Sequence, residues 1–151
     1  MEVIAYGMEY IGGEVKTDIN LVPFREEFFE EYKNIYNECF YEMRKSLDIE
    51  PYYFYSSIEQ LEDKKDKIFV LRENEELIGS ISIIDGEIDD LIVNPKYQRK
   101  GYGKKILLYA INNMQNMGIE IIKLHVAKWN EKALKLYENS SFKCVEIEKI
   151  R

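Results

Sequence analysis

The stretch NPKYQRKGYGKK, residues 94–105, combines the residue types that bind a phosphate group. Five of its twelve residues are basic and two, Gly101 and Gly103, are glycines, although the chain carries a formal net charge of −7. Glycine lets a ligand approach the backbone without meeting a Cβ atom, and lysine or arginine adds charge-assisted hydrogen bonds. If the stretch also opens a helix, free amide hydrogens complete an anion site. It predicts a pyrophosphate site, and the alternative is an ordinary strand-to-helix turn with solvated lysines.

Two well-known phosphate loops do not fit this stretch. A Walker loop requires GxxxxGK[ST], which the chain lacks, and a dinucleotide-binding loop requires GxGxxG, whereas GYGKKI at 101–106 lacks the third glycine. The run QRKGYG, from Gln98 to Gly103, resembles the Q/R-x-x-G-x-G/A signature of the GNAT acetyltransferase superfamily. About thirty residues downstream, WNEKALKLYENSSF at 129–142 resembles that family's N-x-x-A-x-x-x-Y-x-x-x-G-F segment. The pair is much more specific than either motif alone, and the resemblance covers roughly residues 14–147.

The resemblance implies that acetyl-CoA binds with its pyrophosphate on the loop and its pantetheine arm beside the strand at 87–93. In the family this strand and the next parallel strand splay apart, and the gap would admit the thioester. The cofactor-binding residues implied in this way are Ile92, Val93, Gln98, Arg99, Lys100, Gly101, Tyr102, Gly103, Lys104, Asn130 and Ala133. A helix N-cap is an equally good account of Asn130.

The reaction that the resemblance implies is direct transfer of acetyl to a primary amine of a small molecule or of a peptide or protein. Only about one lysine-like amine in two thousand is neutral at pH 7, so a base is needed. Glu87 is the first candidate, because histone-type members of the family keep a catalytic glutamate there, and Asp89 is the second. The alternative for both residues is a solvated carboxylate on a strand, without a catalytic role. Regular alternation would place Glu87, Asp89, Leu91 and Val93 on one face.

The remaining catalytic roles also follow from the resemblance. The amide of Val93 would stabilise the tetrahedral oxyanion. Tyr137 matches the tyrosine that protonates the departing thiolate, and it also fits as an aromatic on the buried face of a helix. His125, the only histidine, lies on an expected strand, where we expect a packing role rather than a base.

The acceptor site is the least determined part of the sequence. In the family the acceptor lies against the first helices and the loop between them, which here contains DIEPYYFYSS. Tyr52, Tyr53 and Tyr55 could surround a cationic amine through cation–π contacts. The alternative is that these aromatic residues pack the helices.

The elements that must position these residues can be read from hydrophobic periodicity. We expect strands at 3–11 and 14–22 as a hairpin around Gly12-Gly13, a helix at 25–46 and a short helix near 57–64. Strands at 67–73, 76–84 and 87–93 follow, then a helix near 102–117, a strand at 119–126, a helix at 130–139 and a strand at 142–150. This order predicts an α+β fold with a GNAT-like mixed, mostly antiparallel central sheet and helices on both faces.

Two departures from the family pattern are visible. Ser141 stands where the family usually has glycine before Phe142. The C-terminus is also shortened, because one strand follows the last helix where the family normally has two. The extra N-terminal strand at 3–11 is a candidate to compensate in the sheet.

The bulk composition limits the class of protein. A chain of 151 residues suits a single domain, 1–151, and 46% hydrophobic with 32% charged residues is typical of a globular protein. We expect no membrane span, no signal peptide and, from two cysteines without metal-ligand spacing, a reducing cytoplasm and no metal site. The acidic balance argues against nucleic-acid binding. A homodimer is compatible with the sequence, which does not determine the oligomeric state.

Three other functions remain open at this point. A non-catalytic acyl-CoA-binding or regulatory module on the same fold would keep the loop and dispense with Glu87 and Tyr137, so the presence of Tyr137 favours the enzyme. A nucleotide-binding protein is disfavoured by the missing loop signatures. A partner-binding protein would use the aromatic stretch at 51–57 and have no affinity for CoA.

Overall fold

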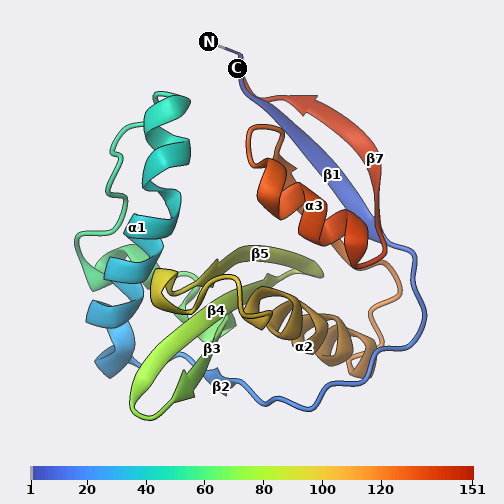
Figure 1. The fold of residues 1–151 in the computed structure, drawn as a ribbon, viewed down its shortest axis with the longest axis horizontal. Helices are drawn as coiled ribbons and strands as arrows, with labels where there is room; N and C mark the ends of the chain where they lie inside the picture. The colour runs from blue at the N-terminus through green and yellow to red at the C-terminus, as the bar shows by residue number, and fades with distance from the viewer. Residues whose placement is uncertain (1) are drawn as a thin grey trace.

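The computed structural model describes residues 2–151, which form one seven-stranded sheet with helices on both faces (Figure 1). The strands are β1 (Ile4–Tyr10), β2 (Val22–Pro23), β3 (Ile68–Glu73), β4 (Glu76–Ile84), β5 (Glu87–Val93), β6 (Lys123–Ala127) and β7 (Phe142–Lys149). The helices are α1 (Phe29–Ser46), α2 (Tyr102–Asn116) and α3 (Glu131–Asn139). No helix within 2–151 is long and apolar enough to cross a membrane.

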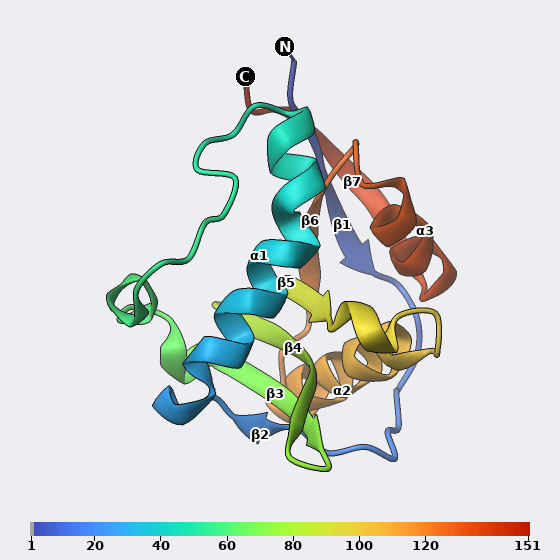
Figure 2. The same cartoon turned by 60° about the vertical axis from the view of Figure 1, so that its left-hand side comes forward.

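The strand order is β2-β3-β4-β5-β6-β1-β7, and β5–β6 is the parallel pair in an otherwise antiparallel sheet. Two apolar cores cover its two faces. One contains the inner sides of α2 and α3, including Ile106, Ile111 and Tyr137, and the other contains the inner side of α1, including Tyr32 and Ile35. Figure 2 shows α1 apart from α2 and α3. The predicted α+β fold with a mixed, mostly antiparallel sheet is confirmed.

The predicted N-terminal hairpin is wrong. β1 lies between β6 and β7 and pairs antiparallel with both, so that Tyr6 is opposite Val126 on one side and Ile147 on the other. The following segment does not return along β1 but runs past α2 to β2. Asn112 Nδ2 donates to the Val15 carbonyl at 2.8 Å. The segment follows α2 because Val15 buries its side chain in the α2 core, which a two-stranded hairpin would leave half exposed.

The N-terminal strand β1 occupies the sheet position between β6 and β7. A single strand, β7, follows α3, and the N-terminal strand supplies the neighbour that β6 and β7 share. Two smaller expectations also change. The predicted helix near 57–64 is a short 3-10 helix, Ile58–Leu61, that begins with a capping box between Ser57 and Gln60. The strand predicted from residue 119 begins only at Lys123.

β5 contains a bulge in its middle. Asp89 lies opposite Ser82 of β4, but Ile92 lies opposite Ser80, so two residues of β5 face one residue of β4. Asp90, the first of these two, has a φ of 47°, in the left-handed region that non-glycine residues seldom adopt. The extra residue reverses the alternation of side chains along the strand.

The bulge corrects the prediction that Glu87, Asp89, Leu91 and Val93 share one face. Ile88 lies in the α2–α3 core, which places its neighbours Glu87 and Asp89 on the α1 face. Beyond the bulge, Leu91 and Val93 pack against the α2–α3 core. The carboxylates and the apolar side chains therefore lie on opposite faces of β5.

The parallel pairing of β5 and β6 ends early. Only Glu87–Lys123 and Ile88–Leu124 are paired, although the strands continue to Val93 and Ala127. The expected splay is confirmed, and a gap opens between the carboxyl-terminal halves of the two strands.

Gly79 of β4 lies opposite Val93, and substitution there should disturb the fold next to the gap. A Cβ at Gly79 would lie 2.5 Å from Ile106 Cδ1 and 2.7 Å from the Ile92 carbonyl oxygen. Because that oxygen moves only with the backbone of β5, we expect Gly79→Ala to lower the free energy of unfolding by about 1–3 kcal/mol. Urea denaturation measures this. Gly13→Ala, where a Cβ meets nothing within 4 Å, is the control. Equal stability of both variants and the wild type would contradict the packing described.

Candidate active site

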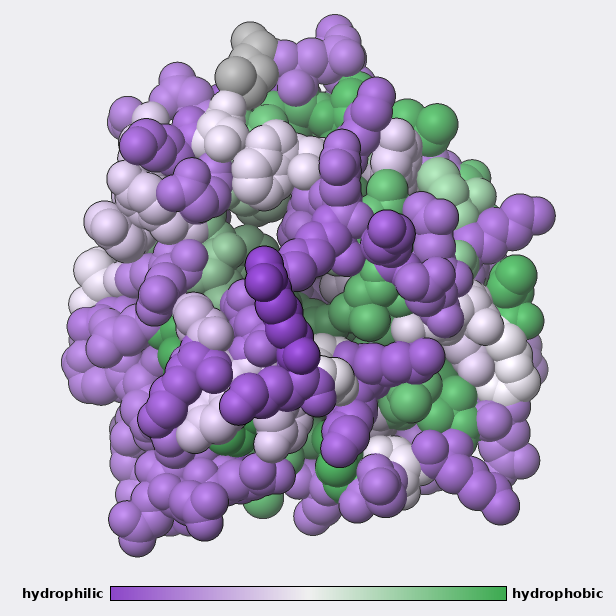
Figure 3. All heavy atoms as spheres, viewed as in Figure 1, coloured by the Kyte–Doolittle hydropathy of each residue, from purple (hydrophilic) through white to green (hydrophobic). Residues whose placement is uncertain are grey.

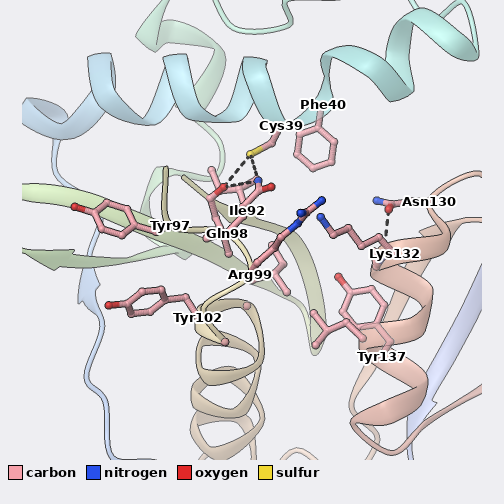
Figure 4. Close-up of a pocket in the computed structure, with 16 residues that line it drawn as sticks. Cys39, Phe40, Ile92, Tyr97, Gln98, Arg99, Tyr102, Asn130, Lys132 and Tyr137 are labelled. Carbon is pink, nitrogen blue, oxygen red and sulfur yellow. Dashed lines mark hydrogen bonds between the residues drawn. The ribbon is translucent and has the colours of Figure 1, made fainter. Parts of the chain in front are cut away.

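A cavity of about 480 Å³ lies where α1, the end of β5, the loop at 94–101, the start of α2 and the start of α3 meet (Figure 4). The space-filling view shows hydrophilic side chains at the front of this face of the molecule (Figure 3). All the cofactor-binding residues implied by the sequence line the cavity except Lys100 and Lys104, which are exposed beside it. The loop and the segment 129–142, thirty residues apart, therefore form one site.

The end of the cavity that we expect to bind phosphate is the start of α2. Gly101 caps the helix with a φ of 86° and no side-chain hydrogen bond. The first amides of α2 are thus left for a ligand, as an anion site requires. Arg99, at a φ of 65°, and Lys132, from α3, point into the cavity from opposite sides, and neither has an ion-pair partner within 2–151 (Figure 4). Two unpaired cations facing one space favour an anion between them.

Six lining residues were not predicted from the sequence: Cys39, Phe40, Leu91, Tyr97, Lys132 and Leu136. Lys132 lies between the predicted Asn130 and Ala133, and its charge is a signal that could have been used. Cys39 and Phe40 come from α1, and nothing in their local sequence marks them, because the fold alone brings α1 to the loop.

The end of β5 is held so that its last amide faces the gap. Asn94 donates its N–H to the Ile78 carbonyl of β4 at 2.8 Å. Because successive residues of a strand point their backbone groups to alternate sides, the Val93 N–H points away from β4, toward the gap. The Val93 carbonyl accepts hydrogen bonds from Gln98 Nε2 at 3.0 Å and Cys39 Sγ at 3.2 Å. Burial raises the pKa of the Cys39 thiol to about 11, so the thiol stays protonated and serves as a donor.

Tyr137 is both a packing residue and a lining residue. Its side chain is 8% exposed and its ring meets Phe142 edge-on, with centroids 5.9 Å apart. Its hydroxyl points into the cavity and bonds to none of the described residues (Figure 4). Burial, and then the charges of Asp89 and Asp90, raise the pKa of this hydroxyl above its usual value. Tyr137 is therefore a neutral donor at pH 7.

The two candidate bases lie in different surroundings. Glu87 is bound to His125 Nδ1, and His125 Nε2 lies 3.4 Å from Glu148 Oε2 of β7. Asp89 makes no ion pair within 2–151 and accepts the Asp90 N–H at 3.0 Å. Surrounding protein, and then the neighbouring charge of Asp90, raise the pKa of the Asp89 carboxyl.

His125 does not have the packing role expected from the sequence. Its side chain is 40% exposed and lies between two carboxylates, on the face of the sheet opposite the buried Leu124 and Val126. Gly7 of β1 is opposite His125, and a Cβ there would come within 3.3 Å of the ring. Glycine at this position therefore makes room for the histidine beside the sheet.

The aromatic residues predicted for the acceptor do not line the cavity. Tyr55 is buried in the α1 core, at 2% exposure. Tyr52 donates its hydroxyl to Asp48, and Tyr53 stacks on Tyr41 at a centroid distance of 4.8 Å. The structure thus places these residues along α1 rather than at the gap.

The arrangement of gap, loop and tyrosine is that of a known family. The model of the acetyltransferase (GNAT) family matches residues 29–142, and the chain belongs to this family. Members of the family use acetyl-CoA.

Two relatives match a shorter stretch of the chain. The [ribosomal protein bS18]-alanine N-acetyltransferase of Haemophilus ducreyi is 40% identical over 60 residues, which are 40% of this chain and 41% of that protein. The mycothiol acetyltransferase of Propionibacterium freudenreichii is 37% identical over 60 residues, 40% of this chain and 19% of that one. The matched stretch is thus less than half of each relative.

Solved structures share the fold over nearly the whole chain. A putative GNAT acetyltransferase from Novosphingobium aromaticivorans superposes with a TM-score of 0.70 at 18% identity, covering 97% of this chain and 62% of that one. The PaiA N-acetyltransferase of Thermoplasma acidophilum, in complex with coenzyme A, superposes with a TM-score of 0.66 at 22% identity, covering 82% and 89%. At these identities the likeness establishes the fold.

The raised pKa of Asp89 predicts a stability that depends on pH. The folded protein holds the Asp89 proton more tightly than the unfolded chain does. The ionisation of Asp89 therefore lowers the free energy of unfolding as the pH rises from the ordinary carboxyl pKa, about 3.9, through the raised pKa of the folded protein. Because the Asp89 side chain is exposed and solvent screens its charge, we expect Asp89→Asn to unfold at a temperature only slightly above that of the wild type at pH 7, by a margin that shrinks toward pH 4. Calorimetry over this range measures the margin.

Asp85→Asn, at an exposed turn position, is the matched control and should show no such margin. A wild type more stable than Asp89→Asn at pH 7 would show that the Asp89 carboxylate is stabilised in the fold and would contradict the assigned direction.

Proposed function

We propose that the protein is an acetyl-CoA-dependent N-acetyltransferase that transfers acetyl directly to a primary amine. One observation carries the proposal. The β5–β6 pairing stops after two residues, and the gap it leaves adjoins the Val93 amide, the uncapped start of α2 and the Tyr137 hydroxyl. These are the groups that a thioester, a pyrophosphate and a leaving thiolate need.

The cavity residues fit the cofactor. The amides of Arg99 to Lys104, with the cations of Arg99 and Lys132, would take the pyrophosphate. The pantetheine arm would run along the free edge of β5 near Ile92 and Val93 as an added strand. When bound, acetyl-CoA supplies the activated acetyl group.

The chemistry then depends on three groups of this chain. Asp89, a carboxylate of raised pKa without an ion-pair partner, takes a proton from the acceptor ammonium, whereas Glu87 is already held by His125. The amine nitrogen attacks the thioester carbon, and the Val93 N–H stabilises the oxyanion. The C–S bond then breaks, Tyr137 donates its proton to the sulfur, and the second amine proton restores the tyrosine.

The acceptor is a cationic amine in this proposal, of a small molecule or of a peptide or protein. Asp89, Glu87 and Glu148 lie on the α1 face of the sheet beside the gap, where their carboxylates attract positive charge. The names of the two relatives refer to an alanine of a ribosomal protein and to mycothiol.

Tyr137→Phe tests the assignment of the proton donor. We expect kcat to fall roughly 100-fold or more, because the thiolate then leaves unprotonated, while the Kd of CoA changes little. Mass spectrometry of acetylated products from a panel of diamines, aminoglycosides and N-terminal peptides measures turnover. Tyr53→Phe, the same change outside the cavity, is the control and should match the wild type.

An unchanged kcat in Tyr137→Phe would remove this role. Intact CoA binding without turnover on any amine would instead favour the non-catalytic acyl-CoA-binding module.

A further inference from the structure

We propose that Lys64 and Tyr36 are positioning residues for the transfer reaction, because they hold Asp90 in the backbone conformation that makes the bulge in β5. The bulge determines which backbone amide and which carboxylate reach the gap. The inference rests on the proposed acetyltransferase function, and it adds two residues that touch neither the cofactor nor the cavity.

Asp90 is held from two elements outside the sheet. Lys64 Nζ, in the segment between α1 and β3, lies 2.8 Å from Asp90 Oδ2, and the two side chains are only 24% and 13% exposed. The Tyr36 hydroxyl, on α1, donates to Asp90 Oδ1 at 3.3 Å. The Lys64 ammonium also lies 5.8 Å from the centre of the Tyr55 ring. We call these contacts the Asp90 clamp.

The charge of Asp90 needs this clamp. A largely buried carboxylate is costly unless it is paired and hydrogen-bonded. Burial alone would lower the pKa of the Lys64 ammonium, but the Asp90 carboxylate outweighs burial and raises that pKa above its usual value. Lys64 is therefore a cation beside Asp90, and removal of Lys64 alone would leave a buried acidic side chain without its counter-ion.

The conformation of Asp90 is also one that the chain would otherwise avoid. Its φ of 47° lies in the left-handed region, which aspartate tolerates better than most residues but still disfavours relative to an extended strand. With both oxygens of its side chain held from the α1 side, Asp90 cannot return to an extended conformation without breaking the clamp.

The bulge matters for the reaction because side chains and backbone groups alternate in direction from one residue of a strand to the next. If Asp90 became extended and the extra residue were absorbed, the residues beyond it would shift by one position. The Val93 N–H would then point to β4 instead of the gap, and Val93 would turn away from the α2–α3 core. The clamp thus fixes the direction of the Val93 N–H, the proposed oxyanion donor. It also fixes the position of Asp89, because Asp89 is adjacent to Asp90 in the strand.

Substitution of Lys64 in two backgrounds tests the clamp. Glycine adopts a φ of 47° readily and carries no carboxylate, so Asp90→Gly should remove the need for the clamp. We expect Lys64→Met to lower kcat at least tenfold in the wild type, with the KM for acetyl-CoA within about twofold. In the Asp90→Gly background the same substitution should change kcat less than about threefold. Lys64→Arg should recover most of the activity.

Lys65→Met is the matched control, because the neighbouring Lys65 makes exposed ion pairs with Glu26 and Glu62 and should have no effect on kcat. Tyr36→Phe keeps the packed ring and removes only the hydroxyl, so it tests the clamp even if Lys64→Met fails to fold. An equal loss from Lys64→Met in both backgrounds, or no loss in either Lys64→Met or Tyr36→Phe, would overturn the proposal.

A crystal structure of Lys64→Met gives a readout that does not depend on turnover. We expect Asp90 to leave the left-handed region and the register of β4 and β5 to change beyond Asp89. An unchanged bulge would overturn the clamp even if the protein is an acetyltransferase. A wild type that acetylates no amine, with a bulge lost in Lys64→Met, would instead overturn the proposed function and leave the clamp in place.

Discussion

The site depends on the early end of one backbone pairing. β5 and β6 are the parallel neighbours of the described sheet, and they are joined only at Glu87–Lys123 and Ile88–Leu124. Beyond that point their facing backbone groups have no ladder partner, which is unfavourable for buried backbone unless another molecule satisfies them. The free edge of β5 is therefore a place where an extended ligand can bind as a strand. The loop, Tyr137 and Asp89 matter because they lie around this opening.

The fold supports the separation of the two strands from both sides. β1 pairs with the whole length of β6, from Ala5–Ala127 to Glu9–Lys123. β6 therefore remains in the sheet without further pairing to β5. β5 is held by β4 on its other edge, and the bulge at Asp90 bends it locally. α2 and α3 close one face, and α1 packs on the other over β3, β4 and β5, with Asp48, just beyond its C-terminal end, bonded to Arg151. On that face, the side chains of His125 and Glu148 remain 40% and 46% exposed.

The sequence predicted the features that depend on residues close together in the chain. Gly101 and Gly103 before an amphipathic run predicted an anion site, and the resemblance of residues 129–142 to the family motif placed Asn130, Ala133 and Tyr137 at the same cavity, which they line. The position of β1 was not predictable in this way, because Gly12-Gly13 is a good hairpin signal that the burial of Val15 against α2 overrides. The bulge was also hidden, since the sequence EIDDLIV at 87–93 gives no sign that a lysine 26 residues before Asp90 will hold it. Contacts between distant residues decide both features.

The most direct test of the account is a calorimetric titration of the folded protein with CoA, beside Gly103→Glu and the control Gly13→Glu. A Cβ at Gly103 meets only Leu136 at 3.6 Å and Val93 at 3.8 Å, so the fold should accept the substitution while a carboxylate enters the phosphate end of the cavity. The account predicts one CoA site of micromolar Kd in the wild type and in Gly13→Glu, and a loss on the order of 100-fold or more in Gly103→Glu. No binding by the folded wild type, or equal binding by Gly103→Glu, would contradict it.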